Sequence, residues 1–195
     1  MTILTFVRHG ETDWNRQGRF QGIQDIPLNE EGRRQARRLA EAWAEGGDLV
    51  LSSPLGRARE TAEILAASMG LKVAALDPRL VERDYGAGAG LTLAERQERF
   101  PDGRIPGVET PESIQDRAKS FLDSMSLAHP RRRVVAVSHG GFINSVLALV
   151  SAGRVGTGKT FLGNASVSIV VLGADGWSVE TVGRTFEAEP LGLKE

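Results

Sequence analysis

Residues 2–10 of the chain read Thr2-Ile3-Leu4-Thr5-Phe6-Val7-Arg8-His9-Gly10, an apolar run that ends in two basic side chains and a glycine. β-Branched and aromatic residues dominate positions 2–7, which predicts a short β-strand that ends before Gly10. Arg8 and His9 therefore stand at the carboxyl end of the predicted strand. In open α/β sheets ligands bind at the carboxyl ends of the strands, so these two side chains are candidates for a functional site.

A second histidine stands in the same setting near the other end of the chain. His139 follows a predicted strand at residues 134–138 and is followed by Gly140-Gly141. The remaining histidine, His129, precedes Pro130 in a turn and is interpreted as a surface residue. Each of these two strand-end histidines is followed by glycine. This shared pattern indicates one site to which both ends of the chain contribute.

Strand-like runs alternate with segments of helical period along the chain, which is typical of an α/β protein. Asn29 is a predicted helix cap, and residues 173–176, Gly-Ala-Asp-Gly, predict a hairpin. We expect a three-layer α/β/α sandwich with a mostly parallel central sheet and an antiparallel edge. The predicted strands are residues 2–7, 48–51, 72–76, 134–138, 166–172 and 177–182. One predicted helix starts after Asn29, and three others cover residues 55–69, 111–125 and 142–150. Residues 12–27 show no clear helical or strand period. Residues 101–111 are expected to form a loop over the sheet edge.

Composition limits the class of protein. A chain of 195 residues fits a single domain, residues 1–195, with a sizeable core. The net charge of −1 argues against a nucleic-acid footprint, and the absence of cysteine excludes disulfides and thiolate metal sites. The sequence shows no signal-peptide pattern and no apolar run of transmembrane length, so we expect a cytoplasmic protein without membrane contact.

Two further charged residues stand near predicted strand ends. Arg57 lies in Ser52-Ser53-Pro54-Leu55-Gly56-Arg57-Ala58, which follows the second strand and opens a helix. A helix N-terminus with an arginine beside it suits a phosphate group. Glu82 follows another strand-like run, in Leu80-Val81-Glu82-Arg83-Asp84-Tyr85-Gly86. Together with Arg8, His9 and His139, these residues predict a site that holds two arginines, two histidines and a carboxylate.

At these blocks the chain resembles the histidine phosphatase superfamily, the phosphoglycerate mutase-like proteins. The first block is Arg8-His9-Gly10-Glu11-Thr12 with Asn15, continued by Phe20-Gln21-Gly22, and the second is the segment around Arg57. Glu82 with Gly86, then Glu109, and Ser138-His139-Gly140-Gly141 complete the pattern in family order. An Arg-His-Gly triplet alone is weak evidence for this family, but four blocks in family order at strand ends are specific evidence for it.

The resemblance implies a catalytic role for five residues. His9 attacks phosphorus and becomes a phosphohistidine, which divides one difficult displacement into two steps. Arg8, Arg57 and His139 bind the phosphoryl oxygens, and the arginines also favour the neutral imidazole that attack requires. Glu82 protonates the leaving oxygen and then accepts a proton from water.

The resemblance also implies what surrounds this centre. It predicts substrate contacts from Asn15, Gln21, Gly22, Arg83, Tyr85 and Gly140. The positive side chains supply the charge, so neither a metal nor a cofactor is expected. The expected partner is a small phosphorylated molecule, and the oligomeric state stays open, with a homodimer as one alternative.

Two other patterns have less specific explanations. Arginines at positions 33, 34, 37, 38 and 131–133 could suggest RNA binding, but the first group lies off the apolar stripe and fits a solvated helix face. Residues 153–160 satisfy the P-loop pattern G-x-x-x-x-G-K-[ST]. A P-loop needs a strand before it and a helix after it, and here a helix precedes and a strand follows. We interpret this segment as a glycine-rich helix-to-strand loop.

The sequence favours a phosphatase of the histidine acid phosphatase type, acting on small phosphomonoesters. A cofactor-dependent phosphoglycerate mutase is the alternative, because Glu82-Arg83-Asp84-Tyr85-Gly86 looks like the mutase form. The mutases carry an insertion with a lysine and paired arginines, whereas this chain has Leu93 at the lysine position and only Arg104 before Glu109 in the shortened segment. A non-catalytic phosphoryl-binding protein ranks last, since all five catalytic positions are filled.

Overall fold

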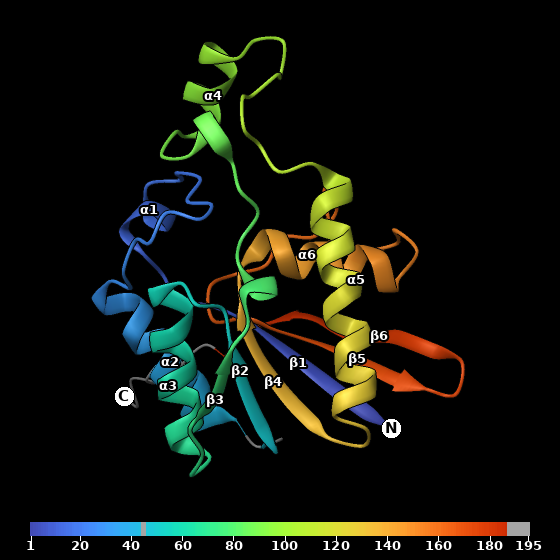
Figure 1. Ribbon diagram of the computed structural model, residues 1–195. Helices are drawn as coiled ribbons and strands as arrows, with labels where there is room; N and C mark the ends of the chain where they lie inside the picture. Colours follow the sequence, from blue (N-terminus) through green and yellow to red (C-terminus); the bar gives the residue numbers. More distant parts are fainter. Residues whose placement is uncertain (44–45, 187–195) are drawn as a thin grey trace, which may run out of the picture.

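A computed structural model describes residues 1–43 and 46–186 of the chain. A six-stranded sheet in the order β3-β2-β4-β1-β5-β6 forms its centre (Figure 1). The predicted domain of residues 1–195 also includes residues 44–45 and 187–195, which lie outside the described part. The strands are β1 (Thr2–Arg8), β2 (Leu49–Ser52), β3 (Val73–Leu76), β4 (Arg133–Ser138), β5 (Val167–Gly173) and β6 (Gly176–Arg184).

The sheet is parallel on one side and antiparallel on the other. β3, β2, β4 and β1 run parallel, whereas β5 pairs antiparallel with β1, and β6 pairs antiparallel with β5. The register of β1 on β4 sets Arg8 opposite Ser138. The residues that follow these two strands, His9 and His139, therefore leave the sheet side by side. This arrangement confirms the predicted mostly parallel sheet with an antiparallel edge.

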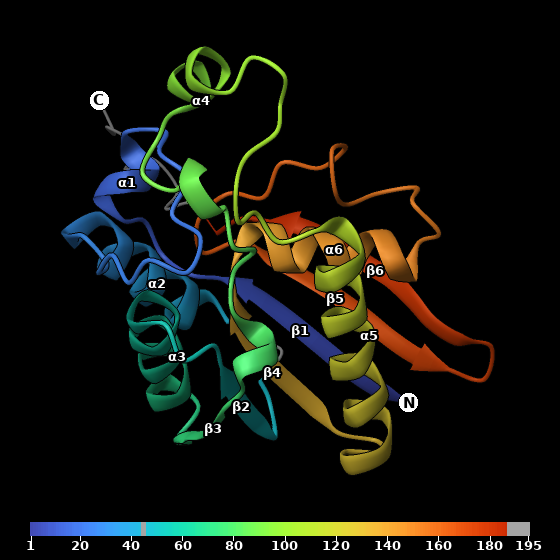
Figure 2. The same ribbon diagram turned by 45° about the horizontal axis from the view of Figure 1, so that its top comes forward.

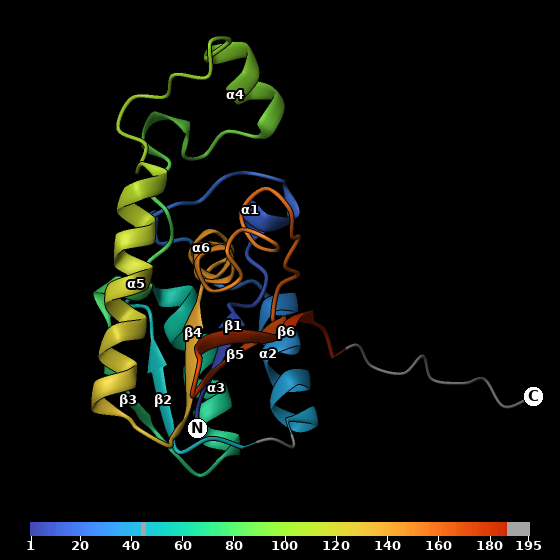
Figure 3. The same cartoon turned by 90° about the vertical axis from the view of Figure 1, so that its right-hand side faces the viewer.

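Helices cover both faces of the sheet (Figure 3). Alternate residues of β1 face opposite ways, so Leu4 and Phe6 pack with α5 and α6, and Val7 packs with α2 and α3. Caps place the helix starts: Asn29 Oδ1 accepts the amide of Gly32, and Thr110 Oγ1 accepts that of Ser113. The helices are α1 (Asp13–Arg16), α2 (Glu30–Ala42), α3 (Gly56–Ser68), α4 (Leu93–Arg99), α5 (Pro111–Ala128) and α6 (Gly140–Val150), with 3₁₀ turns η1 (Pro78–Leu80) and η2 (Gly86–Gly88).

The predictions for residues 12–27 and 101–111 need correction. The first segment contains the short helix α1, which a capping box between Thr12 and Asn15 stabilises and which is too short to show a helical period. The second follows the unpredicted helix α4 and lies beyond the carboxyl ends of the strands, not over a sheet edge (Figures 1 and 2). A bridge between Tyr85 and Val108 joins the two arms of this excursion and keeps it above the site.

The P-loop-like segment 153–160 connects helix α6 to strand β5, so it lacks the strand and helix that a P-loop requires. Gly156 has φ +103°, and a Cβ there would lie 2.3 Å from the carbonyl oxygen of Asn144, so this loop is packed tightly on α6. Three of the four arginines of α2 are paired with carboxylates: Arg33 with Glu30 and Glu60, and Arg34 and Arg38 with Glu31. Across residues 1–43 and 46–186, no helix is long and apolar enough to cross a membrane.

Candidate active site

The two strand-end histidines meet as the sheet register requires. The backbone amide of His9 donates to the carbonyl of Ser138 at 3.0 Å, and the rings of His9 and His139 lie with their centroids 5.1 Å apart. Both residues are buried, with exposed fractions of 2% and 0%. The two ends of the chain therefore build one centre at the carboxyl ends of β1 and β4.

Arg57 reaches this centre from the first turn of α3. It is the largest fully buried side chain among the described residues, and its Nη atoms donate to the carbonyl oxygens of Gln24 and Gly22 at 2.6 and 2.8 Å. Its Nε–H donates to His9 Nε2 at 3.3 Å. Burial lowers the pKa of Arg57 to about 10, which still leaves it cationic at neutral pH. The site thus holds a fixed positive charge beside the His9 ring.

The hydrogen bonds of His9 assign its tautomer. Its Nδ1 lies 2.7 Å from the carbonyl oxygen of Gly10, which can only accept, so Nδ1 carries the proton. Nε2 therefore bears the lone pair. Burial, and then the charges of Arg57 and Arg8, hold the pKa of His9 well below its usual range. The imidazole is neutral at physiological pH and presents a nucleophilic nitrogen.

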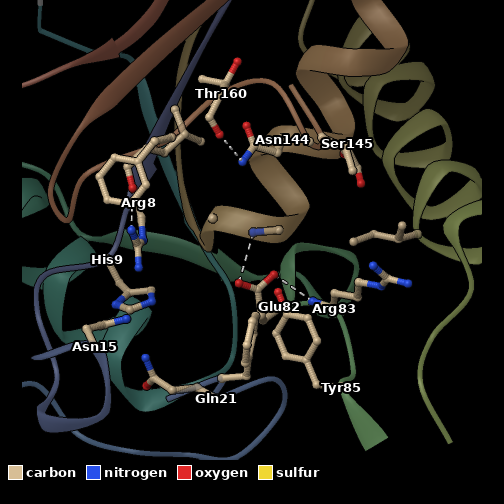
Figure 4. A pocket seen from close by; sticks show the side chains of 18 of the residues that line it. Arg8, His9, Asn15, Gln21, Glu82, Arg83, Tyr85, Asn144, Ser145 and Thr160 are labelled. Carbon is tan, nitrogen blue, oxygen red and sulfur yellow. Dashed lines mark hydrogen bonds between the residues drawn. The ribbon is translucent and has the colours of Figure 1, made fainter. Parts of the chain in front are cut away.

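Glu82 lies across the site from His9 and is anchored to the N-terminus of α6 (Figure 4). Its Oε1 accepts the backbone amides of Arg83 at 2.8 Å and Phe142 at 3.1 Å, and its Oε2 accepts that of Gly141 at 3.1 Å. A Cβ on Gly141 would lie 2.5 Å from Glu82 Oε1, so only glycine permits this approach. The carboxyl group is held in one orientation, facing the pocket.

Arg8 and Asn15 present N–H donors that have no partner among residues 1–43 and 46–186. Arg8 Nη1 donates to the carbonyl of Leu162, while its buried Nε has no partner in the described residues. Asn15 Oδ1 accepts from Thr12 and from Asn164 Nδ2, which turns the amide nitrogen of Asn15 away from these donors. Both groups line the pocket, so their remaining N–H groups are available to an anion.

A cavity of about 490 Å³ opens onto this centre. Most predicted site residues line it, and Gly22 and His139 do not: Gly22 contacts Arg57 through its carbonyl, and His139 is buried beside His9. Burial and the neighbouring Glu82 raise the pKa of Tyr85, so its hydroxyl stays protonated. The predicted residues in the lining are Arg8, His9, Asn15, Gln21, Arg57, Glu82, Arg83, Tyr85 and Gly140.

Other parts of the site were not predicted. Asn164, just before β5, donates to the backbone carbonyl of His9 and so helps to fix the position of the histidine. Arg117 of α5 donates to the Glu109 carboxylate and to the carbonyls of Arg79 and Val81. These hydrogen bonds fix the segment that precedes Glu82. The outer wall adds Ile114, Gln115, Asn144, Ser145, Thr160 and Phe161 from α5, α6 and the following loop. No sequence motif marks Asn164 or Arg117, because their contacts with His9, Arg79 and Val81 join residues far apart in the sequence.

The described residues include no group of three or more histidine, cysteine, aspartate or glutamate side chains that could hold a metal ion. The positive charge of the site comes from Arg8, Arg57 and the N-terminus of α6, whose first residue, Gly140, lines the pocket. A neutral imidazole, two guanidinium groups and one carboxyl group form a constellation suited to phosphoryl transfer.

Comparison with known proteins identifies the class that this fold and site define. Residues 4–185 match the histidine phosphatase superfamily (branch 1), and the chain belongs to that family. The family resemblance drawn from the sequence is thereby confirmed.

Individual relatives include both phosphatases and mutases. The chain is 40% identical to the uncharacterized phosphatase PhoE of Bacillus subtilis, covering 92% of this chain and 93% of the relative. It is 36% identical to the probable phosphoglycerate mutase GpmB of Cronobacter sakazakii, covering 100% and 99%. Among solved structures, a mycobacterial glucosyl-3-phosphoglycerate phosphatase complexed with VO3 has a TM-score of 0.85 at 30% identity, covering 94% of this chain and 99% of that one.

Proposed function

We propose that the protein is a phosphomonoesterase that hydrolyses small phosphorylated molecules through a phosphohistidine on His9. The observation that carries the proposal is the hydrogen-bond pattern of His9: its Nδ1–H donates to the carbonyl of Gly10, and its Nε2 lone pair accepts the Nε–H of Arg57, with the charge of Arg8 also acting on the ring. A neutral nitrogen nucleophile in a cationic pocket suits attack on a phosphate ester.

The reaction takes two displacements. In the first, Nε2 of His9 forms a bond to phosphorus while the ester P–O bond breaks and Glu82 gives its proton to the leaving oxygen. In the second, Glu82 takes a proton from water, whose oxygen bonds to phosphorus as the P–N bond breaks and inorganic phosphate forms. Arg8, Arg57 and Asn15 stabilise the charge on the phosphoryl oxygens in both steps.

The alternative, a phosphoglycerate mutase, is disfavoured by the cations around the pocket. A mutase must retain its bisphosphorylated intermediate while that intermediate reorients, which requires additional cationic side chains to bind it. Leu93 is 59% exposed on α4, Arg96 stacks on Phe20 at 4.0 Å, and Arg104 lies on the surface. None of these three residues lines the cavity, whose cations beyond Arg8 and Arg57 are Arg19 and Arg83. Arg19 is paired with Glu95 at 2.8 Å, which leaves fewer free cations than the mutase pattern has and supports transfer to water.

Replacement of the nucleophile tests the proposal. His9→Ala should abolish turnover of p-nitrophenyl phosphate and remove the acid-labile, base-stable ³²P label that brief incubation with labelled substrate leaves on the wild-type protein. His129→Ala is the matched control, because this histidine lies at the end of α5, outside the pocket lining. Turnover of His9→Ala at the rate of His129→Ala would overturn the proposal.

A substrate panel separates the two reaction types. Phosphoserine, 3-phosphoglycerate, glucosyl-3-phosphoglycerate and sugar phosphates are assayed with EDTA present, and 3-phosphoglycerate also with and without 2,3-bisphosphoglycerate. Release of inorganic phosphate supports the phosphatase. Isomerisation that depends on the bisphosphate, without phosphate release, supports the mutase. A cytoplasmic location, a small-molecule partner and the single domain of residues 1–195 stay predictions.

A further inference from the structure

Ser53 contacts the second histidine of the site. Its hydroxyl oxygen lies 2.8 Å from His139 Nε2, and both residues have an exposed fraction of 0%. The backbone amide of Leu55 also donates to the Ser53 hydroxyl oxygen, at 3.3 Å. The other ring nitrogen, His139 Nδ1, is buried and has no hydrogen-bond partner in the part of the chain that the structure describes.

His139 is neutral in this environment, so one ring nitrogen carries a proton and the other does not. Burial is the main reason that its pKa lies well below the usual range, and the charges of Arg57, Arg8 and Arg117 act in the same direction. A neutral imidazole donates one hydrogen bond and accepts one. The contact with Ser53 therefore decides what Nδ1 can offer.

A count of donors and acceptors separates the two tautomers. If Nε2 carried the proton, the Ser53 oxygen would accept from both Nε2 and Leu55, and its own proton and the Nδ1 lone pair would both be unpaired. If Nδ1 carries the proton, Ser53 accepts from Leu55 and donates to Nε2. Only the Nδ1–H donor is then left over. Since each unpaired buried polar group is unfavourable, the second arrangement is favoured.

We propose that Ser53 is a positioning residue that holds His139 as the Nδ1–H tautomer, with that N–H as a donor to the phosphoryl group at His9. The proposal rests on the phosphoryl-transfer function proposed above. His139 caps α6 before Gly140, and its ring adjoins that of His9 without lining the cavity. In the proposal, its Nδ1–H reaches the phosphoryl group once that group is bonded to His9, and so adds to the donors of Arg8, Arg57 and Asn15. The chemistry is that of a neutral hydrogen-bond donor, distinct from the charged arginines.

The tautomer can be observed in the wild-type protein without any variant. Two-bond ¹H–¹⁵N correlation spectra of ¹⁵N-histidine-labelled protein distinguish Nδ1–H from Nε2–H, and the chain has three histidines to assign. We expect His139 to show the Nδ1–H pattern, and its Nδ1 signal to shift when inorganic phosphate is added. An Nε2–H pattern, or an Nδ1 signal that saturating phosphate leaves unchanged, would overturn the proposal.

Binding measurements on variants test the role of the hydroxyl. Ser53→Ala should weaken binding of inorganic phosphate about tenfold in calorimetric titration, because a buried donor is lost and the tautomer is released. Ser53→Thr, which keeps a hydroxyl, should recover part of the affinity. Ser52→Ala is the matched control, since Ser52 is also fully buried but donates only to the backbone carbonyl of Ser53. Equal loss in Ser52→Ala and Ser53→Ala would overturn the positioning role.

These measurements do not use turnover. Their outcome is therefore independent of the His9→Ala test, so a failure of the Ser53 proposal can be distinguished from a failure of the proposed function. A folded Ser53→Ala protein is recognised by a histidine spectrum in which His9 and His129 are unchanged.

Discussion

The Nε–H of Arg57 points at the Nε2 lone pair of His9, 3.3 Å away, and both side chains are buried. This contact orients the imidazole so that its nucleophilic nitrogen faces the cationic floor of the pocket. In the proposed mechanism, the Arg57 N–H turns from that lone pair to a phosphoryl oxygen when His9 attacks. One donor of Arg57 would then bind the imidazole in the free enzyme and the phosphoryl group in the reaction.

Arg57→Lys should lower kcat/KM by about 100-fold or more, because an ammonium group cannot replace a planar fork that binds Gly22, Gln24 and His9 together. Steady-state kinetics on p-nitrophenyl phosphate measure the effect. Arg59→Lys, two residues along α3 and 55% exposed, is the control and should stay close to wild type. Similar rates in both variants would contradict a role for the guanidinium geometry.

Glu82→Gln should slow hydrolysis of alkyl phosphates by about 100-fold or more, and that of activated aryl phosphates much less. An alkoxide leaves poorly without a proton, whereas a nitrophenolate leaves without one. The measurement is the dependence of kcat/KM on leaving-group pKa across a phosphate ester series. Glu112→Gln, an exposed position on α5, is the control. A uniform loss across the series would mean that Glu82 is not the acid.

Stability should fall as the pH drops below about 6.5. His9 and His139 have lowered pKa values in the folded protein, so the unfolded chain takes up protons on them first. The free energy of unfolding then decreases by about 1.4 kcal/mol per pH unit for each histidine. Urea unfolding between pH 7 and pH 5 measures this slope. The variant that combines His9→Gln and His139→Gln should have a flatter slope, and a flat wild-type curve would contradict the prediction.

Carboxylates affect a different pH window. Hydrogen bonds and charges from arginines hold the pKa values of Asp77 and Glu109 below their usual values, against the effect of burial. The stability that these groups contribute is present above their unfolded pKa values and is lost as the pH falls through the lower folded ones. Their loss therefore begins below about pH 4.5, whereas that of the histidines begins below about pH 6.5, so a fall in stability between pH 6.5 and pH 5 belongs to the histidines.

Arg117→Ala should reduce both stability and kcat, because it releases the segment that carries Glu82. Arg117 and Glu109 are paired at 2.8 Å with side chains only 19% and 13% exposed, and Arg117 also binds two carbonyl groups. We expect a loss of about 2 kcal/mol in urea unfolding. The exposed pair of Arg16 with Asp13 provides the control, and Arg16→Ala should change stability by less than about 0.5 kcal/mol. Equal stability changes in the two variants would argue against the bracing role.

The helices and strands that the sequence predicted are those with strong local signals. The strand before His9, the Asn29 cap and the hairpin at residues 173–176 each follow from adjacent residues, and the structure contains all of them. Helices α1 and α4 escaped prediction because four and seven residues show too little period. Their caps, Thr12 and Thr92, are the signals that could have revealed them.

The sequence by itself determined the chemical groups of the site: two histidines, two arginines and a carboxylate at the ends of predicted strands. Only the tertiary structure decided how they are oriented. Ser53 and His139 are 86 positions apart, and Asn164 lies 155 positions from His9, so their contacts depend on strand order and register. Local pattern places a residue on a strand or helix, but a ring nitrogen acquires its tautomer from whichever distant group the fold brings to it. The motif thus specifies which groups are available for the proposed phosphoryl transfer, and the packing of the sheet and helices sets how each one is oriented.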